Sequence, residues 1–182
     1  MHGIVSLLDG EHYGRVEELW SELEAALGLR GIQVTPYPHF SYQVAEQYDI
    51  ERLVPILGQL AQQSPAFKVR TAGLGVFTGP QPVLFIPLVR SAELGRFQAS
   101  LWQAVAKVTA GAQDYYSPAY WVPHITLALG DLDHRNLPDA IRLLAARDLE
   151  WEIMVENIAV VCDAGSGHEL KVRLELGGEV EG

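Results

Sequence analysis

The chain contains the same five-residue pattern twice, and this repetition constrains its fold more than any other feature. The pattern is proline, histidine, an apolar residue, a hydroxyl residue and an apolar residue. It is written PHFSY at residues 38–42 and PHITL at residues 123–127. With the composition of this chain, two such occurrences by accident are expected on the order of once in ten thousand cases.

The elements expected around the two patterns also repeat. Apolar runs and two-residue alternation predict strands after each Pro-His and at 3–8, 67–79, 82–89, 150–162 and 169–176. Apolar residues at helical spacing, with capping residues before them, predict helices at 11–27, 50–63, 91–110 and 136–147. Each half therefore runs strand, helix, motif strand, helix and two strands, and the strand 82–89 ends one half and begins the other.

This order predicts a duplicated, bilobal α+β fold. We expect two antiparallel sheets flanked by helices and related by an approximate two-fold axis. The 182 residues suffice for one such domain over 1–176, with approximate repeats 1–89 and 82–176, followed by a disordered tail over 177–182. The alternative is an irregular α+β sandwich whose halves only look alike.

Composition restricts the location and the partners. No apolar run approaches the roughly 20 residues that span a bilayer, and the N-terminus lacks a basic signal region, so we expect a cytoplasmic protein without a membrane partner. The single cysteine, Cys162, lies in an apolar run and is expected to be a buried thiol. The net charge of −10 disfavours binding to long duplex nucleic acid, whereas a small nucleotide or an RNA end needs only local contacts. The oligomeric state stays open, and a monomer is plausible.

The two motifs suit proton transfer around a phosphate. Alternation along a strand puts His39 and Ser41 on one face, and likewise His124 and Thr126. If a two-fold axis relates the halves, the two pairs face each other across a cleft. One imidazole can then act as a base toward water or a ribose hydroxyl and the other as an acid toward the leaving oxygen, with the hydroxyls bound to the phosphate oxygens. This chemistry requires no metal and no other cofactor, because neutral and protonated imidazole coexist near pH 7.

These residues resemble the two-histidine (2H) phosphoesterase superfamily, whose signature is two His-apolar-Ser/Thr-apolar motifs. The similarity is greatest to its bacterial 2′-5′ RNA ligase-like proteins and cyclic phosphodiesterases, and it covers most of the chain, including GLGVF at 73–77 and VLFIPL at 83–88. The resemblance implies a bilobal fold with a central cleft, in which His39 and His124 are the acid and the base.

The resemblance further implies a metal-independent phosphoesterase that hydrolyses a cyclic phosphodiester. The substrate would be a 2′,3′-cyclic nucleotide, a cyclic phosphate at an RNA end or an ADP-ribose-type cyclic phosphate. RNA ligase-like members often carry a basic residue just after the second motif, where this chain has Ala128-Leu129. That difference weakens the case for 2′-5′ RNA ligation, which stays open together with a non-catalytic module that binds nucleotides or RNA ends.

Other residues are weaker candidates. Tyr37 and Tyr120 have the strand parity of the two motif histidines and could stack on a base or bind a phosphate. Packing at the edge of a lobe is the alternative for both, as for the other aromatic residues of the loop AQDYYSPAYW. The remaining histidines show no metal-binding spacing and are expected at the surface: His2, His12, His134 and His168.

Overall fold

The computed structural model describes residues 1–177, which form ten strands, four α-helices and three short 3-10 helices. The strands are β1 (His2–Leu7), β2 (His39–Tyr48), β3 (Phe67–Arg70), β4 (Gly75–Phe77), β5 (Val83–Pro87), β6 (Thr109–Ala112), β7 (His124–Ala128), β8 (Glu152–Val155), β9 (Asn157–Asp163) and β10 (His168–Glu175). The helices are α1 (Gly10–Leu27), α2 (Ile50–Gln63), α3 (Ala92–Val105) and α4 (Leu137–Leu144), with η1 (Gly31–Val34), η2 (Ala106–Val108) and η3 (Asp114–Tyr116). Apart from Gly177, the predicted tail 177–182 lies outside the described residues.

The α-helices begin where their capping residues predict. The side chains of Asp9, Asp49 and Ser91 each accept a hydrogen bond from a backbone N–H three residues later, at the starts of α1, α2 and α3. Helix α1 ends at Gly28, whose positive φ of 73° favours glycine. Local sequence therefore sets most helix boundaries.

Four predicted boundaries are wrong. The fourth helix ends at Leu144 rather than near Arg147. The third helix ends at Val105 rather than near 110, because the chain turns through η2 and continues as β6, which was not predicted. The run 67–79 splits into β3 and β4 around Gly73, which has a φ of 70°. The run 150–162 splits into β8 and β9, because β8 leaves the main sheet to pair with β3.

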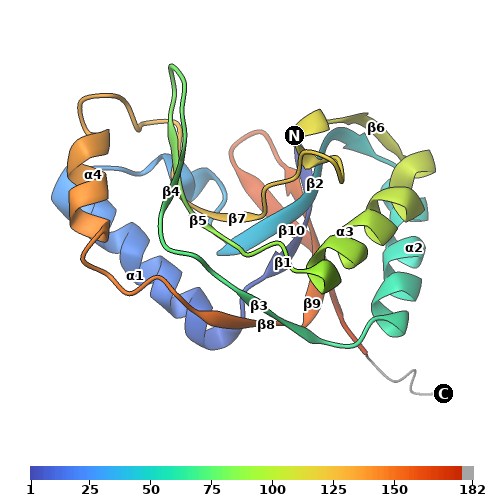
Figure 1. Ribbon diagram of the computed structural model, residues 1–182. Coiled ribbons are helices and arrows are strands. Elements are labelled where there is room, and N and C mark those ends of the chain that lie inside the picture. The colour runs from blue at the N-terminus through green and yellow to red at the C-terminus, as the bar shows by residue number, and fades with distance from the viewer. Residues whose placement is uncertain (178–182) are drawn as a thin grey trace.

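Eight of the ten strands form one antiparallel sheet in the order β10-β9-β1-β2-β7-β5-β4, with β6 pairing beside the far end of β2. The strands β3 and β8 form a second, two-stranded antiparallel sheet. The predicted α+β fold with two antiparallel sheets flanked by helices is confirmed. The two motif strands, β2 and β7, lie next to each other in the middle of the larger sheet (Figure 1).

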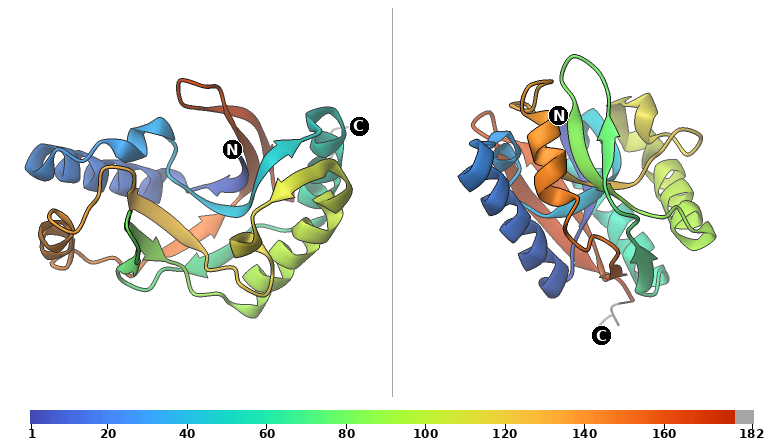
Figure 2. Two further views of the ribbon diagram at one scale, coloured as in Figure 1. Left: turned by 90° about the horizontal axis from the view of Figure 1, so that it is seen from above. Right: turned by 60° about the vertical axis from the view of Figure 1, so that its left-hand side comes forward.

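The helices lie in two pairs, and each pair mixes the two halves of the sequence. Helix α1 packs against α4 at one end of the molecule, and α2 packs against α3 at the other (Figures 1 and 2). Helix α1 also contacts β7, and α2 contacts β9 and β10. The sequence repeats are therefore intertwined, and neither lobe consists of one repeat alone.

The core lies between the main sheet and the helices. The alternate residues of the motifs, Phe40, Tyr42, Ile125 and Leu127, are fully buried there. Cys162 is a buried free thiol, as expected. Among the described residues, no helix is both long enough and apolar enough to cross a bilayer.

Candidate active site

The strands β2 and β7 meet at a single backbone pair. Phe40 lies opposite Ile125, and the strands then diverge, because β2 continues along β1 and β6 while β7 continues along β5. Both residues of the pair point into the core. The approximate two-fold relation between the motifs therefore passes through this pair.

Four polar residues surround the central pair on the opposite face of the sheet. Because β2 and β7 are antiparallel, His39 stands on the side of Thr126, and Ser41 on the side of His124. All four side chains are partly exposed, while their neighbours along each strand are buried. The predicted pairs of imidazole and hydroxyl thus share one face, side by side.

The two imidazole rings are held in the same way. The Nδ1 atom of His39 bonds the carbonyl oxygen of Tyr37, and Nδ1 of His124 bonds the carbonyl oxygen of Val122 at 2.8 Å. A carbonyl only accepts, so each Nδ1 carries the hydrogen. The Nε2 atom of each neutral ring then presents a lone pair, which is the state of a general base.

The proline of each motif fixes the backbone next to the histidine. Leu8 donates its N–H to the carbonyl of Pro38 at 3.1 Å, and Leu88 donates to that of Pro123 at 2.9 Å. Because the φ of proline is restricted, the carbonyl of the residue before it, Tyr37 or Val122, is held beside the histidine ring. Because proline has no N–H, no backbone donor is left unsatisfied there. The repeated proline is therefore explained by the geometry of the histidine that follows it.

Two tryptophans complete the same symmetry. Trp20 of α1 donates its indole N–H to the carbonyl of Thr126 at 3.1 Å, and Trp121 donates to that of Ser41 at 2.9 Å. A buried carbonyl requires a donor, and the two indoles each supply one to a motif strand. The sequence offered no signal for these contacts, which join residues far apart in the chain.

The site lowers the pKa of both histidines. Burial lowers the pKa of His39 to about 4, against the opposing effect of its bond to Tyr37, and the nearby charges of His124 and His168 contribute further lowering. Burial also lowers the pKa of His124, again against its backbone hydrogen bond. Both rings are therefore neutral at pH 7 in the free protein, and an anionic phosphate between them would favour protonation of one.

Two phenylalanines form an aromatic wall around His124. The His124 ring lies 4.9 Å from the ring of Phe77 and 5.1 Å from that of Phe85, and the two phenyl rings are 4.1 Å apart. Gly75 leaves room for this wall, because a Cβ there would stand 2.5 Å from the Phe85 ring. Sequence reasoning missed both phenylalanines, since their role depends on the pairing of β4, β5 and β7.

Tyr37 supports His39 through its carbonyl and packs against an apolar cluster of β1 and β9. Its hydroxyl accepts a hydrogen bond from the N–H of Leu170 at 3.4 Å. His168, on the same hairpin, bonds Thr35 at 2.8 Å through Nδ1. The β9–β10 hairpin thus holds the segment before His39, which gives His168 a position near the site that its sequence setting did not indicate.

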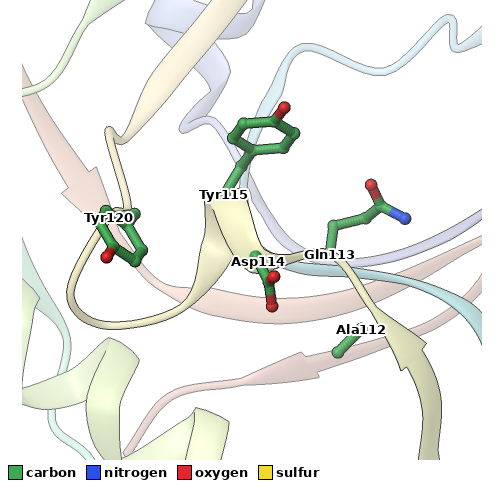
Figure 3. A pocket seen from close by; sticks show the side chains of 5 residues that line it. All are labelled: Ala112, Gln113, Asp114, Tyr115 and Tyr120. Atoms are coloured by element: carbon green, nitrogen blue, oxygen red, sulfur yellow. The ribbon is translucent and has the colours of Figure 1, made fainter.

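Tyr120 lies on the loop between β6 and β7. It lines a pocket of about 680 Å³ with Ala112 of β6 and with three other residues of that loop (Figure 3): Gln113, Asp114 and Tyr115. The two tyrosine candidates therefore differ, because Tyr37 is part of the support of His39 whereas Tyr120 faces a pocket.

The expectation that His12 lies at the surface is wrong. Its side chain is buried, with Nδ1 2.6 Å from a carboxylate oxygen of Asp9 and its ring 5.5 Å from that of Trp151. It thereby links the start of α1 to the segment before β8. Within residues 1–177, no three His, Cys, Asp or Glu side chains gather as metal ligands.

Comparison with known proteins supports the family resemblance and the fold. The chain matches the profile of a family described as the 2′-5′ RNA ligase superfamily over residues 9–166. No curated protein matches the sequence. Among solved structures, the protein TT0787 of Thermus thermophilus superposes with a TM-score of 0.67 at 19% identity, covering 98% of each chain. A structure described as a phosphoesterase gives a TM-score of 0.56 at 15% identity, covering 97% of this chain and 98% of the other.

Proposed function

The chain belongs to the 2′-5′ RNA ligase superfamily, and on that premise we propose that it is a phosphoesterase that hydrolyses a cyclic phosphodiester. The observation that carries this proposal is the matched presentation of two imidazoles, each with Nδ1 bound to a backbone carbonyl and Nε2 available. The substrate class is a 2′,3′-cyclic nucleotide, a cyclic phosphate at an RNA end or an ADP-ribose-type cyclic phosphate.

The reaction follows from the two nitrogens. A phosphate above the central strand pair would lie between Nε2 of His39 and Nε2 of His124. One nitrogen removes a proton from water as the water oxygen bonds to phosphorus, and the other donates a proton to the ribose oxygen as its bond to phosphorus breaks. The product is a phosphate monoester, and the base and acid have exchanged protonation states. The imidazoles supply both proton transfers, so the proposed mechanism uses no metal.

The hydroxyls of Ser41 and Thr126 would bind the non-bridging phosphate oxygens. Each lies on the same strand face as its histidine, two residues away. Hydrogen bonds to these oxygens stabilise the charge that grows in the transition state.

Two observations favour hydrolysis of a small substrate over RNA ligation. Ala128, directly after the second motif, is buried and brings no cation to the site. The net charge of −10 opposes binding of two long RNA strands. Ligation and simple binding remain as outcomes that an experiment can distinguish.

The test is an assay of 2′,3′-cyclic nucleotides and of oligonucleotides with a cyclic phosphate end, in the presence of EDTA. We expect turnover by the natural protein and a loss of about 10²- to 10⁴-fold in kcat for either His39→Gln or His124→Gln. A matched control is His134→Gln, which changes an exposed histidine away from the motifs.

Other results would contradict the proposal. Retained turnover in either motif variant would refute the two-histidine mechanism. Tight binding of all substrates without turnover would indicate a binding module. Joining of RNA ends without hydrolysis would indicate a ligase.

A further inference from the structure

The pocket on the loop between β6 and β7 has the size and the lining of a small-ligand site. Its volume of about 680 Å³ lies within the usual range for ligand pockets. Figure 3 shows Tyr120 at one end of the lining, Ala112 and Gln113 at the other, and Asp114 between them, with Tyr115 above. The lining combines aromatic rings with a carboxylate and an amide, which are groups that recognise heterocycles.

The pocket is attached directly to the motif strand β2. Gln113 donates its backbone N–H to the carbonyl of Val44 at 2.9 Å, three residues beyond Ser41, or about 10 Å along the strand. At the other end of the loop, Trp121 follows Tyr120 and donates to the carbonyl of Ser41. The pocket therefore lies within the reach of a nucleotide whose phosphate is bound at Ser41.

The loop that forms the pocket is held firmly. Gln98 donates two hydrogen bonds from its buried amide, to the carbonyl of Tyr42 at 3.2 Å and to that of Tyr116 at 2.7 Å. The guanidinium of Arg90 donates to the carbonyl of Pro118. The backbone of the loop is thus tied to β2 and α3 before any ligand binds, which lowers the entropic cost of ordering the loop.

The two tyrosines of the pocket are unusually exposed. Tyr115 is 79% and Tyr120 is 73% exposed, the largest values among the large hydrophobic side chains of residues 1–177. Within residues 1–177, neither the Tyr115 ring nor the Tyr120 ring packs against another aromatic ring. Exposed phenol rings beside a phosphate site are suited to stacking on a base, and such stacking tolerates any base.

Asp114 offers the pocket a hydrogen-bonding group, which stacking alone lacks. Within the described residues its carboxylate makes no hydrogen bond and no ion pair, and it is exposed to the pocket. A carboxylate only accepts hydrogen bonds. On its Watson–Crick edge, guanine alone presents two adjacent hydrogen-bond donors, N1–H and the N2 amino group. On the same edge of the other bases, each donor has an acceptor beside it.

We propose that this pocket binds the base of the substrate nucleotide, by stacking on Tyr115 and Tyr120, and selects guanine through Asp114. This inference rests on the proposed function for its substrate, a nucleotide with a cyclic phosphate. It adds a specificity site formed by residues outside the two motifs.

The test compares the 2′,3′-cyclic phosphates of guanosine, adenosine, cytidine and uridine. We expect the guanosine compound to have the highest kcat/KM, by roughly tenfold or more, which is typical of a two-bond base contact. Asp114→Asn should remove this preference mainly through KM. Tyr115→Ala should raise KM for every base, while Tyr115→Phe keeps the ring and should preserve binding. Asp139→Asn, on the exposed face of α4, is the matched control.

Calorimetric binding of guanosine and adenosine 3′-monophosphates separates this inference from the proposed function. If no cyclic phosphate is hydrolysed, the proposed function fails. Tighter guanosine binding that Asp114→Asn abolishes would still support the pocket. Equal binding and equal kcat/KM for all bases, or a guanine preference that survives Asp114→Asn, would overturn the inference.

Discussion

At the scale of single residues, the site depends on where protons reside. The backbone carbonyls of Tyr37 and Val122 fix the hydrogen on Nδ1, so that Nε2 of each ring is the atom that titrates. Burial then lowers the pKa of both rings below the ordinary value of 6.5. The free protein therefore has fewer protonated imidazoles near neutrality than two exposed histidines would have.

These pKa shifts predict the pH dependence of the reaction. The proposed mechanism needs one neutral and one protonated imidazole. We therefore expect kcat/KM to decrease at pH values below the lower apparent pKa of the pair and at pH values above the higher one. Both pKa values are lowered, that of His39 to about 4. We therefore expect a bell-shaped profile of kcat/KM against pH, with its maximum below pH 6.5. The bound anionic substrate raises both pKa values, and the profile of kcat should lie at higher pH than that of kcat/KM. Steady-state kinetics between pH 4 and 9 check this, and a maximum of kcat/KM above pH 7 would contradict it.

At the scale of elements, neighbouring strands determine what surrounds each motif. The antiparallel pairing of β4 with β5 places Gly75 opposite Phe85, and the pairing of β5 with β7 places Phe85 opposite Thr126. The aromatic wall around His124 is therefore set by the register of three strands.

Substitution of Gly75 tests the aromatic wall. In Gly75→Ala the new Cβ would collide with the Phe85 ring and displace it relative to His124. We expect kcat/KM to fall by roughly tenfold to a hundredfold, because small misplacements of catalytic groups are costly. Gly58→Ala in α2 is the control, since a Cβ there meets nothing within 4 Å, and it should stabilise the helix without loss of activity. Unchanged activity in Gly75→Ala would show that the position of Phe85 does not matter.

Asp131 connects the segments next to the two motif strands. Its carboxylate accepts the backbone N–H groups of Arg30 at 2.5 Å and Gly31 at 2.7 Å, which ties η1 to the turn after β7. We expect Asp131→Ala to reduce the free energy of unfolding by about 1–3 kcal/mol, measured by urea denaturation. Asp131→Asn keeps an acceptor oxygen and should lose less. Equal losses in the two variants would indicate that these hydrogen bonds add little.

At the scale of the whole molecule, local signals in the sequence predicted the elements better than their assembly. The capped helices and the motif strands follow from residues close in sequence, such as Asp49 before α2. The strand β6 has the sequence TAGA, which carries no strand pattern, and it forms only because β2 offers a partner. The burial of His12 likewise depends on Trp151, far along the chain.

The same difference applies to the candidate site. Alternation predicted that His39 and Ser41 share one face of their strand, and that His124 and Thr126 do likewise, because this rule acts within one strand. The pairing of β2 with β7, which places the two pairs next to each other, joins distant segments. The supporting tryptophans, the aromatic wall and the contact between His168 and Thr35 join distant segments. No periodicity within one segment encodes such contacts.

The intertwining of the two sequence halves has a consequence for how the protein is made. Strand β1 pairs with β9, so that His2 lies opposite Cys162, and α2 needs α3 to cover it. A growing chain that has reached Arg90 contains the first motif and the helices α1 and α2. It still lacks α4 and α3, against which these two helices pack. Contacts between such distant residues slow folding, and an unfinished chain exposes its apolar faces. The surface that carries the two motifs therefore forms only after β7 and β9 have joined the sheet.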